Sequence, residues 1–149
     1  MAKQDLIEYV TVHIGGQLFG VNVSEIREVF CPQAITPVPR APDGIAGLLN
    51  LRGRIVTMID CRARLGLSAR DTDEPAMALG LEVGSELFGV LVDTVGEVLR
   101  LDVQAMEPPP GHLDPQWRTL IRGVYQLEDQ LLAILDARDL IGRRGALAA

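Results

Sequence analysis

The sequence predicts an all-β protein in which two small barrels of about five strands each pack together. Each half of the chain contains short apolar segments separated by tight turns, with only short helical turns besides. One supersecondary unit occurs twice in the chain. Aromatic residues make up only 4% of the sequence, so the cores must be built from Val, Ile and Leu. Closing the strands into barrels would remove the unpaired edges that promote aggregation.

The stretch Gly47–Gly66 is the most informative part of the repeated unit. It reads as a strand, a turn at Arg52-Gly53, a second strand and a short helix. Glycine in the turn tolerates a positive φ, and Asp60 is a suitable N-cap for the helix. Residues Ile121–Gly142 repeat this element, with Asp136 in the place of Asp60. We therefore expect two matching elements in the fold.

A second repeated element precedes each copy of the first. Segment Phe19–Val29 matches Phe88–Val98 through the shared pattern F-G-V-x-V-x-x-[IV]-x-E-V. Each follows a turn rich in glycine, at Gly15-Gly16 and at Gly84-Ser85. The chain is therefore two copies of one unit.

The polar stretch Leu67–Pro75 separates the two copies. We expect a single domain over residues 1–149, with a first barrel half at 1–73 and a second at 74–149. A half of this size is near the lower limit for a core that is stable alone, so the halves should share an interface. Terminal segments could cross over between them.

The other elements follow from turn and proline positions. The expected strands are Leu6–Ile14, Gln17–Val23, Ile26–Phe30, Ala76–Val83, Glu86–Val92 and Val95–Leu101, and short helical turns are expected at Gln116–Ile121 and Ala137–Ile141. A helix over Val23–Phe30 is an alternative, because its apolar residues also share a helical face. The proline-dense connectors Cys31–Pro42 and Met106–Pro115 permit neither a helix nor a central strand.

Composition excludes several classes of protein. The net charge is −6, and no basic run extends beyond Arg143-Arg144, which argues against nucleic acid as a partner. No signal peptide is evident, and no apolar run approaches the roughly 20 residues that span a bilayer, so we expect a cytoplasmic chain without membrane insertion. Cys31 and Cys61 lie outside any CxxC motif or Cys/His cluster. We expect two reduced cysteines, no metal site and no cofactor.

No constellation of residues typical of an enzyme occurs, and no residue is predicted to be catalytic. We interpret Asp60 and Asp136 as helix N-caps rather than as a carboxylate pair. Glu28 and Glu97 also recur, and the residues alone leave open whether they contact a partner or face solvent. Arg52 at a hairpin tip could bind a partner's carboxylates or merely aid solubility. The sequence thus predicts an interaction protein.

The arrangement resembles the CheW family, the adaptor proteins of bacterial chemotaxis arrays. The resemblance covers nearly the whole chain and rests on the two repeated elements, the proline connectors and the N-L-R-G hairpin at Asn50–Gly53 with its downstream I-D-x-R at Ile59–Arg62. It implies two SH3-like five-stranded barrels around a shared hydrophobic interface. It also implies an adaptor without enzymatic activity.

In function, the resemblance implies coupling of the histidine kinase CheA to methyl-accepting chemoreceptors. The family binds the kinase's regulatory domain barrel to barrel, and it binds the cytoplasmic tip of the receptor in a groove between its own barrels. The positions that would lie in or near partner surfaces are Ile26, Glu28, Gly47, Asn50, Arg52 and Gly53, with Met77 and Val95 lining the groove. The chain would be cytoplasmic and recruited to membrane-associated receptor arrays.

Two alternatives stay open at this point. A CheW-like scaffold could serve a chemosensory pathway that does not control motility. A small-barrel nucleic-acid binder is disfavoured by the acidic balance and by the lack of clustered aromatic residues.

Overall fold

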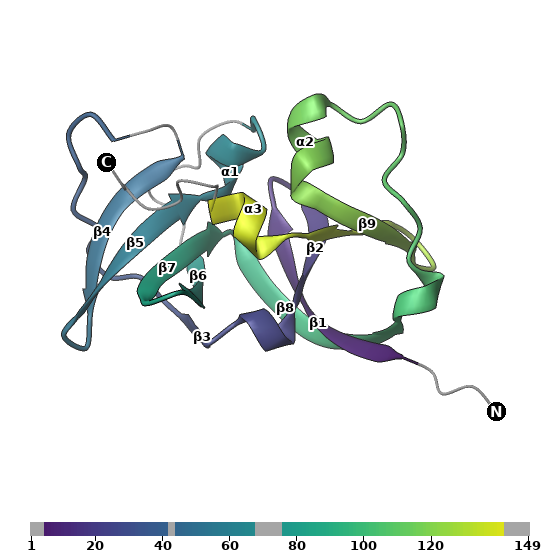
Figure 1. The fold of residues 1–149 in the computed structure, drawn as a ribbon, viewed down its shortest axis with the longest axis horizontal. Helices are drawn as coiled ribbons and strands as arrows, with labels where there is room; N and C mark the ends of the chain where they lie inside the picture. The colour runs from purple at the N-terminus through teal and green to yellow at the C-terminus, as the bar shows by residue number, and fades with distance from the viewer. Residues whose placement is uncertain (1–4, 42–43, 68–75, 142–149) are drawn as a thin grey trace.

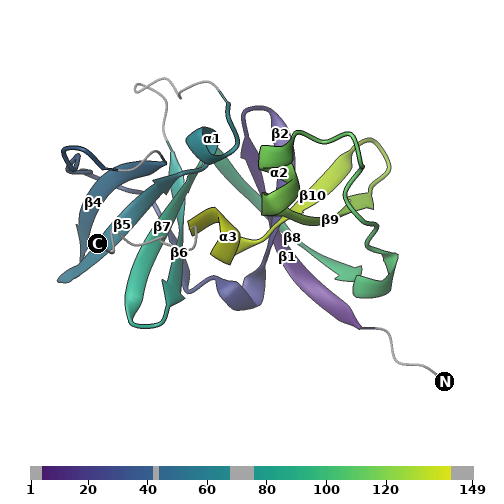
Figure 2. The same cartoon turned by 45° about the horizontal axis from the view of Figure 1, so that its top comes forward.

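A computed structural model describes residues 5–41, 44–67 and 76–141, and it contains two five-stranded sheets (Figures 1 and 2). The strands are β1 (Leu6–Ile14), β2 (Gln17–Asn22), β3 (Glu28–Phe30), β4 (Ile45–Leu51), β5 (Arg54–Asp60), β6 (Met77–Val83), β7 (Glu86–Val92), β8 (Thr94–Asp102), β9 (Ile121–Gln126) and β10 (Leu131–Leu135). The helices are α1 (Cys61–Arg64), α2 (Pro115–Leu120) and α3 (Ala137–Ile141), with single 3-10 turns η1 (Val23–Glu25) and η2 (Val103–Ala105).

Each sheet closes on itself. Sheet A has the strand order β8-β1-β2-β10-β9, and sheet B has the order β3-β6-β7-β5-β4. The segment after β3 bridges to β4 at Thr36 and Leu48, and the segment after β8 bridges to β9 at Glu107 and Val124. These bridges join the two ends of each sheet, so the predicted pair of five-stranded barrels is confirmed.

The sheets do not divide at residue 73, which corrects the bounds of the expected barrel halves 1–73 and 74–149, whereas the N-terminal hairpin does cross over, as the sequence allowed. Sheet A combines the first hairpin, β1-β2, with the last three strands, whereas sheet B combines β3–β5 with the hairpin β6-β7. The two repeats therefore exchange their leading hairpins. Parallel pairing of β2 with β10 and of β5 with β7 completes each exchange. Such pairing joins segments distant in sequence, and no local pattern indicates it.

The exchange creates a core that belongs to both barrels. A central cluster draws on both sheets and includes Val12, Phe19, Ile59, Phe88 and Leu135. Two smaller clusters fill the individual barrels, one around Met58 in sheet B and one around Leu132 in sheet A. A chain whose largest core lies between its barrels should unfold as one unit.

Most local elements agree with the sequence prediction. Asp60 and Asp136 are helix N-caps, because their Oδ1 atoms accept the N–H groups of Arg62 and Arg138 at 3.0 and 3.1 Å. At Val23–Phe30 the structure has one 3-10 turn followed by β3, and not the alternative amphipathic helix. Among the described residues, no helix is both long and apolar enough to cross a membrane.

Candidate partner-binding surface

The tip of the β4–β5 hairpin has a conformation set by three of the predicted residues. Arg52 and Gly53 have φ angles of 51° and 88°, as the two central residues of a type I′ turn require. The Asn50 side-chain oxygen accepts the N–H of Gly53 at 2.9 Å. Asn50 and Gly53 therefore shape the turn, and the Arg52 side chain projects from it.

The Arg52 guanidinium pairs with the carboxylate of Glu28 on β3. The two side chains are 68% and 35% exposed, so the pair contributes at most about 1 kcal/mol to stability. They border a shallow hollow that Ile26, Leu51, Arg54 and Leu87 also line. The structure thus brings together Ile26, Glu28 and Arg52, which the sequence placed in or near partner surfaces.

Exposed apolar residues beside this hollow were missed in the sequence. Ile55 is 61% exposed and lines a neighbouring hollow with Arg54 and Leu87, and Val29 on β3 is 42% exposed. The corresponding positions in the second repeat, Leu131 and Val98, are 46% and 51% exposed. The sequence holds apolar residues at these positions in both repeats, but this pattern does not distinguish exposed residues from core residues.

The other predicted residues lie elsewhere. Gly47 is buried and, as glycine, has no side chain. Met77 on β6 and Val95 on β8 are half-buried, and both pack, as Ile26 does, against the central cluster between the barrels. Met77 begins β6, at the end of the strand opposite its turn with β7.

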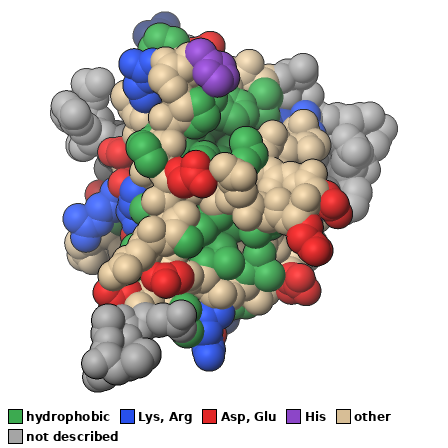
Figure 3. Space-filling view, turned by 90° about the vertical axis from the view of Figure 1, so that its right-hand side faces the viewer, with side chains coloured by type: hydrophobic (Ala, Val, Ile, Leu, Met, Phe, Trp, Pro, Cys, Tyr) green, Lys and Arg blue, Asp and Glu red, His purple; other side chains and the backbone are tan. Residues whose placement is uncertain are grey.

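Hydrophobic side chains also gather at the outer end of sheet A, between acidic side chains (Figure 3). Half-buried apolar residues around the sheet A core are Ile7, Leu99, Leu101, Met106 and Leu127. No residue of this group was predicted from the sequence to bind a partner.

Arg62 and Arg122 each form an ionic cluster away from the hairpin tip. Arg62 on α1 donates to both carboxylate oxygens of Asp93, at 3.2 and 2.7 Å. Arg122 on β9 pairs with Glu25 of η1 at 3.3 Å and with Asp136 at 3.2 Å. Burial disfavours the charge on Arg122, but these two carboxylates outweigh it and raise the pKa of the guanidinium.

The described residues show no group of three His, Cys, Asp or Glu side chains that could hold a metal ion. Burial, reinforced by Asp60 and Asp93, raises the pKa of the Cys61 thiol, so this cysteine stays protonated. Cys31 is exposed, and both cysteines are free.

Comparison with known proteins identifies the family. The CheW-like domain model matches residues 8–144. The chain is 30% identical over 129 residues to the chemotaxis protein CheW of Rhizobium meliloti, which covers 87% of this chain and 83% of the relative. It is 31% identical over 104 residues to protein FrzA of Myxococcus xanthus, across 69% of this chain and 64% of that protein.

The comparison of structures indicates the same family. The crystal structure of the scaffolding protein TtCheW from Thermoanaerobacter tengcongensis superimposes with a TM-score of 0.82 at 26% identity, over 98% of this chain and 93% of that one. Two closed five-stranded sheets, the repeated hairpins and the match over residues 8–144 agree. The chain belongs to the CheW family of non-enzymatic chemotaxis scaffold proteins.

Proposed function

We propose that this chain couples the histidine kinase CheA to methyl-accepting chemoreceptors, by binding the regulatory domain of the kinase and the cytoplasmic tip of the receptor. Family membership and the relatives named as chemotaxis proteins support an adaptor of this kind. The proposal places the chain in the cytoplasm, at receptor arrays beneath the membrane.

The hairpin tip is the proposed kinase surface. Arg52, Glu28 and the exposed Ile55 put charge and apolar area side by side, as the rim and centre of a protein interface do. The main support for this part of the proposal is that the Arg52–Glu28 pair lies on an exposed face. An exposed pair adds little to the stability of the fold, so its charges are available to a partner. Asn50 and Gly53 would act by holding the turn.

The receptor would bind along the half-buried rim of the central cluster. Ile26, between η1 and β3, Met77 on β6 and Val95 on β8 are half-buried and pack against this cluster. An amphipathic helix could lay its apolar face against such residues, and the flexible thioether of Met77 suits an irregular contact. Gly47 takes part only indirectly, because it is buried.

Calorimetric titration with the isolated CheA regulatory domain from the same source tests the kinase contact. We expect binding that Arg52→Glu weakens at least tenfold, or about 1.4 kcal/mol. Arg100→Glu is a matched control, because Arg100 pairs with Glu8 at 3.6 Å on sheet A and is similarly exposed. No heat and no co-elution, with either the kinase domain or a receptor-tip fragment, would reduce the family match to a match of fold.

A CheW-like scaffold in a chemosensory pathway that does not control motility is the second candidate. The similarity to FrzA, a relative that is not named as a chemotaxis protein, supports this second candidate. Swimming-plate assays of a strain that lacks this chain separate the two candidates, because only a chemotaxis adaptor is needed for spreading.

A further inference from the structure

The two repeats build two corresponding corners, where a leading hairpin meets a crossover and a short helix. In the first corner the Asp93 carboxylate accepts hydrogen bonds from the Arg62 guanidinium and from the N–H of Gly15, the latter at 2.8 Å. Asp93 stands where the chain leaves β7 for β8. This cluster, the Asp93 clasp, joins the β1–β2 turn and α1.

The repeat assigns a counterpart to each member of the Asp93 clasp. The spacing that matches Phe19 with Phe88 also matches Ser24 with Asp93 and Gly15 with Gly84. The spacing that matches Asp60 with Asp136 matches Arg62 with Arg138. Ser24 stands where the chain leaves β2, Gly84 lies in the β6–β7 turn and Arg138 is on α3.

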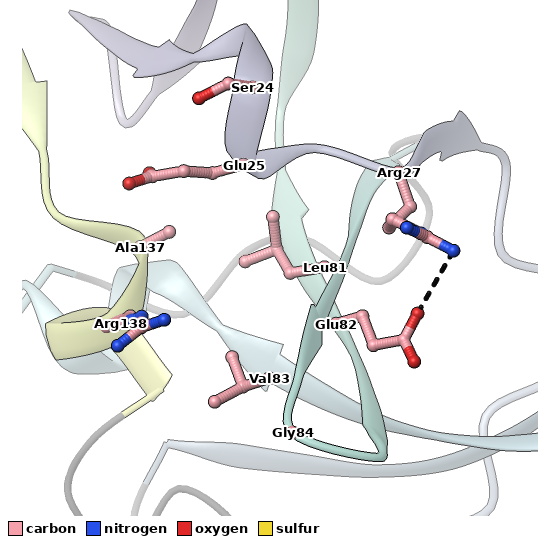
Figure 4. A pocket seen from close by; sticks show the side chains of 9 residues that line it. All are labelled: Ser24, Glu25, Arg27, Leu81, Glu82, Val83, Gly84, Ala137 and Arg138. Carbon is pink, nitrogen blue, oxygen red and sulfur yellow. Dashed lines mark ion pairs between the residues drawn. The ribbon is translucent and has the colours of Figure 1, made fainter.

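The second corner contains a cavity at the position that corresponds to the Asp93 carboxylate of the first corner. Ser24, Gly84 and Arg138 line one cavity of about 460 Å³, together with Leu81, Val83 and Ala137 (Figure 4). The turn glycines have the same conformation, with φ angles of 60° at Gly15 and 64° at Gly84. Ser24 itself has no carboxylate to accept hydrogen bonds from Arg138 and Gly84, although the carboxylates of Glu25 and Glu82 also line the hollow.

The lining of the hollow carries charges of both signs, from Glu25 and Glu82 and from Arg27 and Arg138. Among the side chains drawn in Figure 4 the one ion pair is Arg27–Glu82, at 3.3 Å. Glu25 pairs with Arg122 at 3.3 Å, whereas the guanidinium of Arg138, whose backbone N–H binds Asp136, forms no ion pair among the described residues. The Oε1 atom of Glu25 is buried and lacks a described hydrogen-bond partner, so an occupant that also brings an N–H group would satisfy it.

We propose that this hollow receives an acidic side chain of a protein partner, which takes the place that Asp93 fills in the first corner. The carboxylate would accept hydrogen bonds from the Arg138 guanidinium and the Gly84 N–H, while a backbone N–H of the same segment reaches Glu25. Bidentate recognition of a carboxylate by arginine gives both strength and direction. The inference deepens the proposed adaptor function and rests on it for the identity of the partner.

The repeat also supplies the decisive variant. In Ser24→Asp, the new carboxylate should accept hydrogen bonds from Arg138 and Gly84, as Asp93 does from Arg62 and Gly15. It should therefore exclude the partner's carboxylate without removing a group from the hollow. Arg138→Gln should remove the principal donor instead. Arg138→Gln removes a guanidinium, whereas Ser24→Asp adds a carboxylate. If both variants weaken partner binding, the common cause is therefore the loss of the partner's carboxylate site and not the loss of one structural contact.

The experiment has two arms. In the first, the isotope-labelled chain is titrated with N-acetyl-glutamate methylamide, an acidic peptide mimic, and followed by NMR. We expect a saturable shift of the Gly84 amide resonance in the wild type and none in Ser24→Asp. In the second, calorimetry with the kinase regulatory domain and with a receptor-tip fragment should show at least tenfold weaker binding of one partner for both variants, with Arg100→Gln within twofold of wild type.

An unresponsive Gly84 resonance in the wild type would overturn the proposal, as would partner affinities within twofold of wild type for both variants. If the wild-type chain binds neither partner, the adaptor function fails, and the titration with the mimic still decides whether the hollow takes a carboxylate.

Discussion

Gly47 faces the backbone carbonyl of Thr36 with no room for a side chain between them. A Cβ placed on Gly47 would come within 2.4 Å of the Thr36 oxygen, and its φ is 150°. Thr36 and Leu48 exchange backbone hydrogen bonds of 2.8 and 2.9 Å here, which close sheet B. In sheet A a Cβ on Gly123 would lie 2.8 Å from the Glu107 oxygen, so both barrels close over a glycine.

Gly47→Ala is therefore expected to destabilise the fold by at least about 2 kcal/mol, since neither the carbonyl nor the backbone conformation can yield cheaply. Urea unfolding measures this loss. Gly111→Ala is the matched control, because nothing lies within 4 Å of a Cβ at that position. A Gly47→Ala chain with wild-type stability that binds no partner would instead favour the direct partner role inferred from the family resemblance.

Exchanging the charges of the hairpin-tip pair separates an intramolecular role from a partner contact. Arg52→Glu alone should weaken kinase binding and shift the thermal midpoint by only a few degrees, since exposed substitutions cost under about 0.5 kcal/mol. The double variant Glu28→Arg/Arg52→Glu restores the pair in reverse. If the Arg52 guanidinium contacts the kinase, calorimetry will show that binding stays weak in the double variant; full recovery would mean that the pair only holds β3 and the hairpin together.

Val95 tests the receptor groove, and its packing dictates the choice of substitution. An aspartate would place a charge against the central cluster, so Val95→Ala is the better variant, with a stability cost of about 1 kcal/mol. We expect weaker binding of a receptor-tip fragment and little change in kinase affinity, both measured by calorimetry. Stronger loss of kinase binding than of receptor binding would refute this placement of the groove.

Stability should fall as the solution becomes alkaline. Burial raises the pKa of the Cys61 thiol, and burial together with the Tyr9 hydroxyl raises the pKa of the Tyr125 phenol. Both groups stay neutral in the fold and ionise in the unfolded chain near their ordinary values of about 8.5 and 10, so the stabilisation is complete below pH about 8.5 and is lost above it.

Urea midpoints measured from pH 7 to 11 check this expectation. Cys61→Ala should flatten the first part of the decline, whereas Cys31→Ser, at an exposed position, should leave the profile unchanged. A profile of the Cys61→Ala chain that parallels the wild type would show that Cys61 is not responsible.

The exchanged hairpins predict that neither half folds alone. Fragments 1–73 and 74–149 each carry a leading hairpin whose partners lie in the other fragment. We expect each to lack dispersed NMR resonances and their mixture to recover the spectrum of the intact chain. A folded, monomeric 1–73 fragment would contradict the exchange.

Local sequence patterns determined much of this protein. The strands, the glycine turns, the N-caps Asp60 and Asp136 and the repeat itself follow from the period of apolar residues and from the conformations that Gly, Asp and Pro permit. The repeated motifs also carried the resemblance to the CheW family, because they extend over nearly the whole chain.

Tertiary structure alone decided how the repeats combine. The pairing of β2 with β10 and of β5 with β7, the partner of Arg52 and the burial of Gly47 all depend on contacts between segments distant in sequence. Apolar residues such as Ile55 look the same in sequence whether they face the core or solvent. The difference between the Asp93 clasp and the hollow at Ser24 also appears only in the tertiary structure. The sequence does not show which donors surround a serine.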